Sequence, residues 1–574
     1  MRRALPDITG LAVVVGAAVV VMLPALVHGA SLGSFDLLSR YGLTQQTGVA
    51  VHNAQTTDQI AEMIPWTAVA WTQVHHGLVP LWNPFNGLGM PLAFNWQSSV
   101  FSLPTLVSYA APLRLAYTVQ VLVTLVLAGV GTYVFGRVLR LGVTACVMAA
   151  VVYELSGAFM GFLGWPIAVV MAWAGWSFAA VTLVVRGRRR LGSVLLLAAV
   201  DAAAVYAGQP DALVLLGIGL VVFSVVLLAL HVRARGTARS ALRPLGDLVV
   251  ATVVGGALAA PLLLPGAQLI SGSVFVHAPR ATTALSPYDL VNLVFQGFNG
   301  ATVTRSQWFA IGSAAYVGVI ALVLALMGAA LGRRRPEVVA LTTVGVVLGA
   351  LVYLPPVAAV AGDLPFRARW HLGLVVVTFA VAVLAGVGTD ALIASPRAYA
   401  TKMWLWSGFG VGALVIAALW VLGRGHLPPP AARIRDQSFV WPALCTVLGL
   451  AVAAALSAKT SPPDVLHPPR IARRVGLGQG AALVFVAAEL AFLVAVGSSV
   501  WASSGSFLVA GAPVRALQQA VGSSLVGFGA PSCELPPTLG LLPETNAAFG
   551  VHELSAYDPI TPRADFRALK APTA

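Results

Sequence analysis

Long apolar stretches, separated by short polar turns, recur along most of this chain. Each is about 20 residues long, which is enough to cross the ~30 Å hydrocarbon core of a membrane as a helix. Thirteen such stretches can be counted, at residues 10–28, 113–136, 142–162, 166–185, 191–207, 211–231, 246–265, 309–332, 338–358, 371–393, 403–422, 439–458 and 479–501. The pattern predicts an all-α polytopic membrane protein with about 13 transmembrane helices.

The composition narrows the class of protein further. Of 574 residues, 58% are hydrophobic and 9% are charged, whereas a soluble domain carries about 25% charged residues. A water-soluble enzyme and a disordered protein are therefore excluded. The three cysteines are far apart and odd in number, so they suggest neither a disulfide framework nor a zinc motif.

The net charge of +14 follows from membrane topology, and nucleic acid is not expected as a partner. The basic residues lie in clusters between apolar stretches, the tightest at 186–190 and 333–335. Cytoplasmic loops of membrane proteins collect Lys and Arg in this way. We therefore predict that the N-terminus is inside and the C-terminus outside, with membrane lipids around the apolar helices.

This topology leaves three long segments outside the membrane. They are a first outer loop at 29–97, a second outer loop at 266–308, and a tail at 502–574 that is rich in Pro, Gly and Ser. A short segment at 361–370 also lies outside. Residues 1–501 then form one transmembrane domain, and the tail follows it as an extracytoplasmic segment.

The first outer loop carries the strongest candidate for chemistry. Thr57 suits a helix N-cap, which places Asp58 in the first turn. Apolar residues then recur on roughly one face, at Ile60, Met63, Ile64, Trp71 and Val74. We predict an amphipathic helix along the outer membrane surface, whose dipole keeps Asp58 ionised and able to act as a general base for an acceptor hydroxyl. The alternative is that Asp58 only caps the helix.

A chain of turns follows this helix, in Asn83-Pro84, Asn86-Gly87 and Gly89-Met90-Pro91. It predicts either a compact surface loop or a rigid floor beneath a sugar and acceptor pocket. In the second case the stacking and hydrogen-bonding groups are Gln59, Trp82, Asn83, Asn95, Trp96 and Gln97.

Several short segments occur in a consistent order along the chain. They are Asp58-Gln59, Pro65-Trp66, Leu81-Trp82-Asn83-Pro84, Gly89-Met90-Pro91, Phe101-Ser102-Leu103-Pro104, Ala207-Gly208-Gln209-Pro210, Tyr288-Asp289-Leu290, Gly297-Phe298-Asn299-Gly300, Pro365-Phe366-Arg367-Ala368-Arg369, Gly386-Val387-Gly388-Thr389-Asp390, Asn546 with Gly550, and Tyr557-Asp558-Pro559. Their order and spacing resemble the bacterial YfhO-type membrane proteins, which belong with the GT-C class of polytopic glycosyltransferases.

The resemblance implies that a sugar moves from a polyprenyl-phosphate carrier to a cell-envelope glycan or glycolipid acceptor, at a site on the outer face of a bacterial cytoplasmic membrane. The acidic residue in the family's first outer loop would map onto Asp58. Similar chains continue past Tyr557-Asp558-Pro559 into a soluble domain, so the resemblance implies that 502–574 is a truncated outer domain. Tyr557 and Asp558 would close over the acceptor, or Asp558 would only stabilise a turn.

Four outer arginines run against the positive-inside trend, namely Arg280, Arg305, Arg367 and Arg369. A planar guanidinium donates two parallel hydrogen bonds and suits a phosphate group. We predict that these arginines bind the phosphate of the lipid carrier. For Arg367 and Arg369 the alternative is headgroup binding or a salt bridge to Asp363.

Three carboxylates lie inside apolar stretches, at Glu154, Asp201 and Glu489. Acids at membrane depth are costly and often functional. They indicate either hydrogen bonds between helices or a proton or substrate path, and a path would make the protein a transporter or flippase of lipid-linked saccharides. A third alternative is a non-catalytic assembly partner. No cofactor is expected, and a divalent metal has no support because the outer loops hold no Asp-x-Asp pair.

Overall fold

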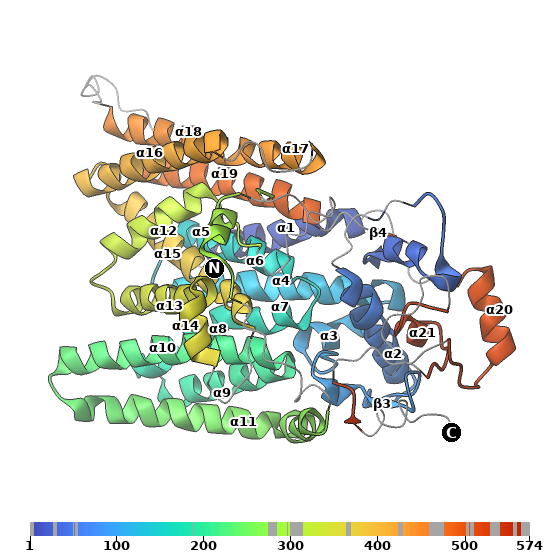
Figure 1. The fold of residues 1–574 in the computed structure, drawn as a ribbon. Coiled ribbons are helices and arrows are strands. Elements are labelled where there is room, and N and C mark those ends of the chain that lie inside the picture. Colours follow the sequence, from blue (N-terminus) through green and yellow to red (C-terminus); the bar gives the residue numbers. More distant parts are fainter. Residues whose placement is uncertain are drawn as a thin grey trace.

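Helices dominate the computed structural model. It describes residues 5–26, 31–49, 51, 56–187, 189–273, 284–295, 297–298, 314–362, 369–422, 429–458, 476–500, 504–505, 510–528, 540–554 and 560–563. In Figure 1 the long helices run side by side across the picture, and α2, α3, α20 and α21 lie together beyond one end of them. We call the described parts of 31–112 and 510–554 the cap.

The bundle is built from helices of very different lengths. They are α1 (Leu5–Leu26), α4 (Leu113–Val138), α5 (Val143–Glu154), α6 (Gly157–Gly161), α7 (Pro166–Met171), α8 (Ala174–Arg186), α9 (Arg190–Tyr206), α10 (Pro210–Arg235), α11 (Leu242–Ser271), α12 (Val319–Leu331), α13 (Pro336–Tyr353), α14 (Pro355–Gly362), α15 (Leu374–Ala394), α16 (Tyr399–Leu422), α17 (Pro429–Ser438), α18 (Val440–Ser457) and α19 (Leu477–Val500).

The cap contains shorter elements. Its helices are η1 (Phe35–Arg40), η2 (Gly42–Thr44), η4 (Gln59–Met63), α2 (Ile64–His75), η5 (Ala93–Asn95), α3 (Leu103–Ser108), α20 (Ala512–Val521) and α21 (Thr545–Ala548). Two antiparallel strand pairs join β1 (Ser31–Leu32) to β4 (Ser504–Gly505) and β2 (Trp82–Asn83) to β3 (Met90–Pro91).

Each of the thirteen apolar stretches contains a helix, and the polytopic membrane fold is confirmed. Eleven helical segments among the described residues are long and apolar enough to cross a membrane. The other two stretches hold shorter helices, because α9 has 17 residues and α12 has 13. The number of thirteen spans and the N-in orientation therefore remain predictions.

The helix predicted at 309–332 begins only at Val319. The preceding residues Ala315, Tyr316 and Val317 are buried without being helical. Their backbone groups bond to neighbouring elements, since Tyr316 accepts from the Gly157 amide at 2.7 Å and Val317 donates to Leu293 at 3.0 Å. Non-helical backbone at membrane depth is tolerated only where the protein supplies such partners.

The centre of the bundle lies between α4, α5, α8, α10 and α15. An aromatic cluster fills it, formed by Phe135, Tyr153, Phe178, Phe223 and Phe379. In other parts of the bundle, the helix backbones approach so closely that large side chains do not fit between them. A Cβ atom added at Gly388 of α15 would lie 2.0 Å from the Leu324 carbonyl oxygen of α12, so small residues let these two helices touch.

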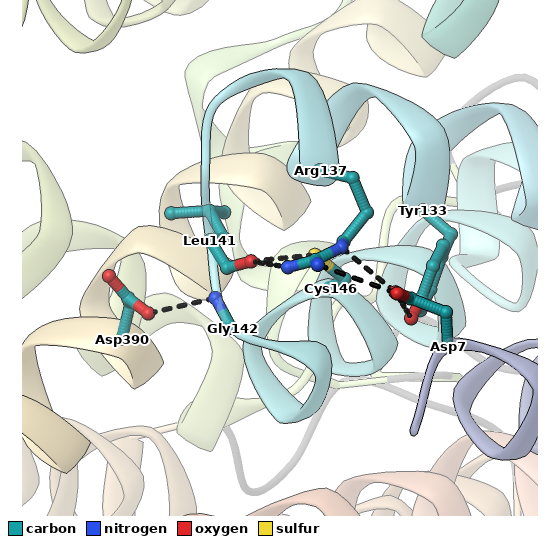
Figure 2. A network of polar contacts seen from close by, with 7 residues as sticks. All are labelled: Asp7, Tyr133, Arg137, Leu141, Gly142, Cys146 and Asp390. Carbon is teal, nitrogen blue, oxygen red and sulfur yellow. Dashed lines mark hydrogen bonds and ion pairs between the residues drawn. The ribbon is translucent and has the colours of Figure 1, made fainter. Parts of the chain in front are cut away.

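The end of the bundle opposite the cap is fixed by polar contacts (Figure 2). Arg137 of α4 pairs with Asp7 of α1 at 2.9 Å and donates to the Leu141 carbonyl at 2.5 Å. Asp390 of α15 accepts a hydrogen bond from the Gly142 amide at 3.0 Å. The turn between α4 and α5 is thus tied to both α1 and α15, and the predicted topology places it in the cytoplasm.

The tail packs directly onto the first outer loop within the cap. A chain of buried amides crosses the junction, since Asn83 donates to Asn86 at 2.9 Å and Asn86 donates to Asn546 at 3.1 Å. Trp66 donates to the Glu544 carboxylate at 3.3 Å. Loop and tail therefore form one packed unit, although they lie at opposite ends of the sequence.

Candidate functional site

Asp58 lies at the entrance to an unusual helix. Its own backbone is already helical, with φ −59° and ψ −30°, and its side chain makes no capping hydrogen bond. The next five residues, Gln59–Met63, form a π-helical segment that continues into α2. The alternative in which Asp58 serves as a helix cap is therefore not supported. π-Helical turns occur frequently at functional sites.

The predicted position of this helix on the membrane surface is wrong for its first half. All residues from Gln59 to Ala70 are buried, because α2 packs against α4 on one side and against α21 of the tail on the other. The apolar stripe of the sequence is real, but the remaining faces are covered as well. The shorter α3 instead exposes apolar side chains, at Leu103, Leu106 and Val107.

Burial controls the protonation of Asp58. Its pKa is raised above the ordinary value of 3.8, chiefly because its carboxylate is partly withdrawn from water. A hydrogen-bonding interaction with the Trp165 indole and the positive charge of Arg369 both lower the pKa in part. The helix dipole alone predicts a lowered pKa for Asp58, whereas the pKa is raised, because desolvation is the larger effect.

The loop that carries Trp165 is held from two sides. Gln59 donates to the Leu163 carbonyl at 3.1 Å, and Tyr117 of α4 donates to the Gly164 carbonyl at 2.9 Å. Trp165 itself is buried and directly precedes α7. The residue next to Asp58 thus fixes the loop that supplies a partner to Asp58.

Arg369 reaches the same region from another part of the chain. It directly precedes the short helix η11 (Trp370–Gly373), which packs against the start of α10. Its Nε donates to Asp211 Oδ2 at 2.8 Å, and the Arg369 side chain remains 48% exposed. Asp211 is the second residue of α10, so Arg369 links the start of α10 to the segment before α15, and its charge also acts on Asp58.

The turn before α10 is tightly packed against the first outer loop. Ser99 donates to the Ala207 carbonyl at 2.7 Å, and a Cβ atom at Gly208 would lie 2.3 Å from the Trp96 carbonyl oxygen. Trp96, Ser99 and Gln209 all adopt positive φ, at 64°, 50° and 45°. Such conformations cost energy in residues other than glycine and tend to gather at functional sites.

The residues predicted to form a sugar pocket have different environments. Asn83 and Asn95 are buried and bonded locally, since Asn83 binds Asn86 and Asn95 accepts from the Ser98 amide at 2.9 Å. Gln97 is half-buried, and Trp82 is 49% exposed. Only the last two present accessible surface, so a sugar-binding role remains a prediction for all four.

Several predicted site residues lie outside the described part of the chain. They are Arg280, Arg305, Arg367, Tyr557 and Asp558. Their roles stay as predicted from the sequence.

Two of the carboxylates at membrane depth differ in their surroundings. Asp201 of α9 hydrogen-bonds to Thr252 of α11, which fits the interpretation as a link between helices. Glu154 is fully buried against Gly129 of α4, and its oxygens have no hydrogen-bond partner among the described residues.

The sequence interpretation missed three residues of this site, namely Trp165, Gln209 and Asp211. A signal was available for Asp211, because it is an acid in a short outer turn and thus a candidate partner for an unexplained outer arginine. No group of three His, Cys, Asp or Glu side chains within the described ranges is placed to hold a metal ion.

Comparison with known proteins supports the fold. No model of a protein family matches the sequence, and no curated protein matches it either. Among solved structures, ArnT from Cupriavidus metallidurans bound to undecaprenyl phosphate is similar with a TM-score of 0.51 and 17% identity, over 98% of this chain and 87% of that one.

Two further solved structures show weaker similarity. ArnT in the apo state gives a TM-score of 0.49 at 16% identity, over 89% of this chain and 84% of that one. Arabinosyltransferase EmbB from Mycobacterium smegmatis gives a TM-score of 0.38 at 14% identity, over 84% of this chain and 40% of that one. These values are too low to support a conclusion of their own. The undecaprenyl-phosphate-bound ArnT structure and the apolar helices together show a multi-pass membrane protein with a GT-C-like fold similar to that of ArnT.

Proposed function

We propose that this protein is a membrane glycosyltransferase that moves a sugar from a polyprenyl-phosphate carrier to a cell-envelope acceptor, with Asp58 as general base. The observation that carries this proposal is the electrostatic interaction between Asp58, a half-buried acid, and Arg369, a half-exposed cation, at the cap end of the bundle. The ArnT-like fold supports the proposal, because the similar ArnT structure contains undecaprenyl phosphate.

The reaction is a single displacement at the anomeric carbon. The acceptor hydroxyl oxygen forms a bond to that carbon while the bond from the carbon to the phosphate oxygen breaks. The proton of the hydroxyl passes to the Asp58 carboxylate, and the polyprenyl phosphate leaves with the bonding electron pair. Arg369 stabilises the charge that develops on this phosphate.

The environment of Asp58 suits this role. A general base works best when its pKa is close to the operating pH, and burial raises the pKa of Asp58 in that direction. The Trp165 hydrogen bond and the charge of Arg369 both favour the charged form, so they offset part of this rise in the pKa.

A transfer assay tests this proposal. The full-length protein, in proteoliposomes, is given a panel of radiolabelled undecaprenyl-phosphate monosaccharides and a bacterial membrane-glycan extract as acceptor. We expect Asp58→Asn to reduce transfer about 10²–10⁴-fold, the usual contribution of a general base. Asp36→Asn, which neutralises another acid of the same loop, should keep the wild-type rate. Wild-type transfer by Asp58→Asn, or no transfer from any donor, contradicts the proposal.

A further inference from the structure

The Arg369 guanidinium is held in one orientation by the neighbouring carboxylate of Asp211. Asp211 Oδ2 accepts from Arg369 Nε at 2.8 Å, and Asp211 Oδ1 accepts from Gln209 Nε2 at 2.7 Å. Both carboxylate oxygens are thus occupied, and the Asp211 side chain is only 16% exposed. The acid therefore has little freedom to move away from the arginine.

The tether uses the inner nitrogen of the arginine and leaves the outer ones available. Within the described part of the chain, the two terminal Nη groups of Arg369 make no hydrogen bond. These groups, on a half-exposed side chain near Asp58, can donate to an incoming anion. An arginine fixed in this way loses less side-chain entropy on binding than a freely rotating one.

The turn that holds Gln209 gives a second reason to assign a function here. Gln209 has φ 45°, and the preceding Gly208 has φ 89° with no room for a side chain. Trp96 and Ser99, on the facing loop, are also in the left-handed region. A simple surface ion pair needs none of this strain, whereas a positioning device for a functional arginine justifies it.

We infer that Asp211 is a positioning residue, which orients Arg369 so that its terminal nitrogens bind the phosphate of the lipid carrier. This inference rests on the proposed function, because it assigns a ligand to the same site. Gln209 has a supporting role, since it fixes the second oxygen of Asp211.

Binding of undecaprenyl phosphate to the full-length protein in nanodiscs tests the inference without any sugar transfer. We expect Asp211→Asn to weaken binding about tenfold and Asp211→Glu to recover part of the loss. Gln209→Ala should have a smaller effect in the same direction. The matched control is Asp247→Asn, which breaks an Arg190–Asp247 ion pair of 2.7 Å in another part of the bundle and should leave binding unchanged.

A double-mutant cycle separates positioning from general stabilisation. If Asp211 acts only through Arg369, Asp211→Asn combined with Arg369→Gln should bind no more weakly than Arg369→Gln alone. Additive losses would overturn the inference, as would wild-type or tighter binding by Asp211→Asn, since tighter binding means that Asp211 competes with the phosphate. Absence of saturable binding to the wild-type protein would instead overturn the proposed function, together with the inference.

Discussion

The positive charge of Arg369 lowers the pKa of Asp58, although one residue belongs to the first outer loop and the other precedes α15. A base and a phosphate-binding cation need to be close neighbours in a glycosyl transfer from a lipid phosphate. Each of the two side chains also has a polar partner, since Trp165 hydrogen-bonds to Asp58 and Asp211 forms an ion pair with Arg369.

The pH dependence of transfer should report this relationship. Asp58 acts as a base only when deprotonated, so kcat/KM falls on the acid side as its carboxyl gains a proton. Arg369→Gln removes a charge that lowers the pKa of Asp58, so the acid limb should move to higher pH. Arg515→Gln, which removes a cation from α20 of the cap, serves as control. An acid limb that stays in place or moves to lower pH would contradict this assignment.

Stability should respond to Asp58 in the opposite sense to activity. Because burial raises the pKa of Asp58 in the folded state above 3.8, the folded protein binds more protons than the unfolded one, and stability falls as pH rises through this range. Asp58→Asn should therefore raise or preserve the apparent Tm at about pH 7. The difference should shrink near pH 4, as measured by thermal unfolding in detergent. A lower Tm for Asp58→Asn at neutral pH would be inconsistent with a desolvated carboxylate.

The amide chain between loop and tail should be costly to interrupt. Asn86→Ala leaves the Asn83 donor and the Asn546 acceptor buried without their partner, and each such group costs about 1–3 kcal/mol. We expect faster proteolytic cleavage within the cap. Gln45→Ala, at an exposed position of the same loop, should be cleaved at the wild-type rate. Equal cleavage of both variants would show that the chain of amides contributes little.

Glu154 separates enzyme from transporter. Its carboxyl, on the last residue of α5, is fully buried and faces Gly129 of α4. If the protein is a transferase, Glu154→Gln should keep sugar transfer within a few-fold of wild type. A transporter predicts instead that Glu154→Gln stops movement of a labelled lipid-linked saccharide across proteoliposomes. Loss of such movement, with none in empty liposomes, would favour the transporter.

Orientation can be read from cysteine labelling. Cys146 and Cys445 are buried, so a Cys533→Ser background should react slowly with a membrane-impermeant maleimide. In that background, Gln45→Cys in the cap should be labelled from outside in intact cells. Ser240→Cys, between α10 and α11, should react only after permeabilisation. The reverse pattern would exclude the N-in topology.

The helices of the bundle could be predicted well from the sequence, because each membrane span leaves an unbroken apolar stretch of about 20 residues. The sequence was less informative for the cap. Hydrophobic periodicity identifies the face of α2 that carries apolar residues, but it does not reveal that α21 covers the other side. The pairing of Arg369 with Asp211 was also hidden, because it depends on η11 packing against α10, a contact between segments distant in sequence.

Asp58 was predicted from its residue type and its place in the loop, and the predicted topology puts Asp58 and Arg369 on the same side of the membrane. Trp165 could not be found in this way. Its indole reaches Asp58 only because Gln59 and Tyr117 bend the loop after α6 into position, and neither hydrogen bond leaves a pattern in the sequence.

The docking of the tail onto the first outer loop also sets a timetable for biosynthesis. Residues around Asn86 are synthesised early, whereas Asn546 emerges only after the last long helix has been made. The loop must therefore wait for its partner through most of translation. A ribosome that stalls late, or a nascent chain released too soon, would leave a full complement of inserted helices with an unfinished cap.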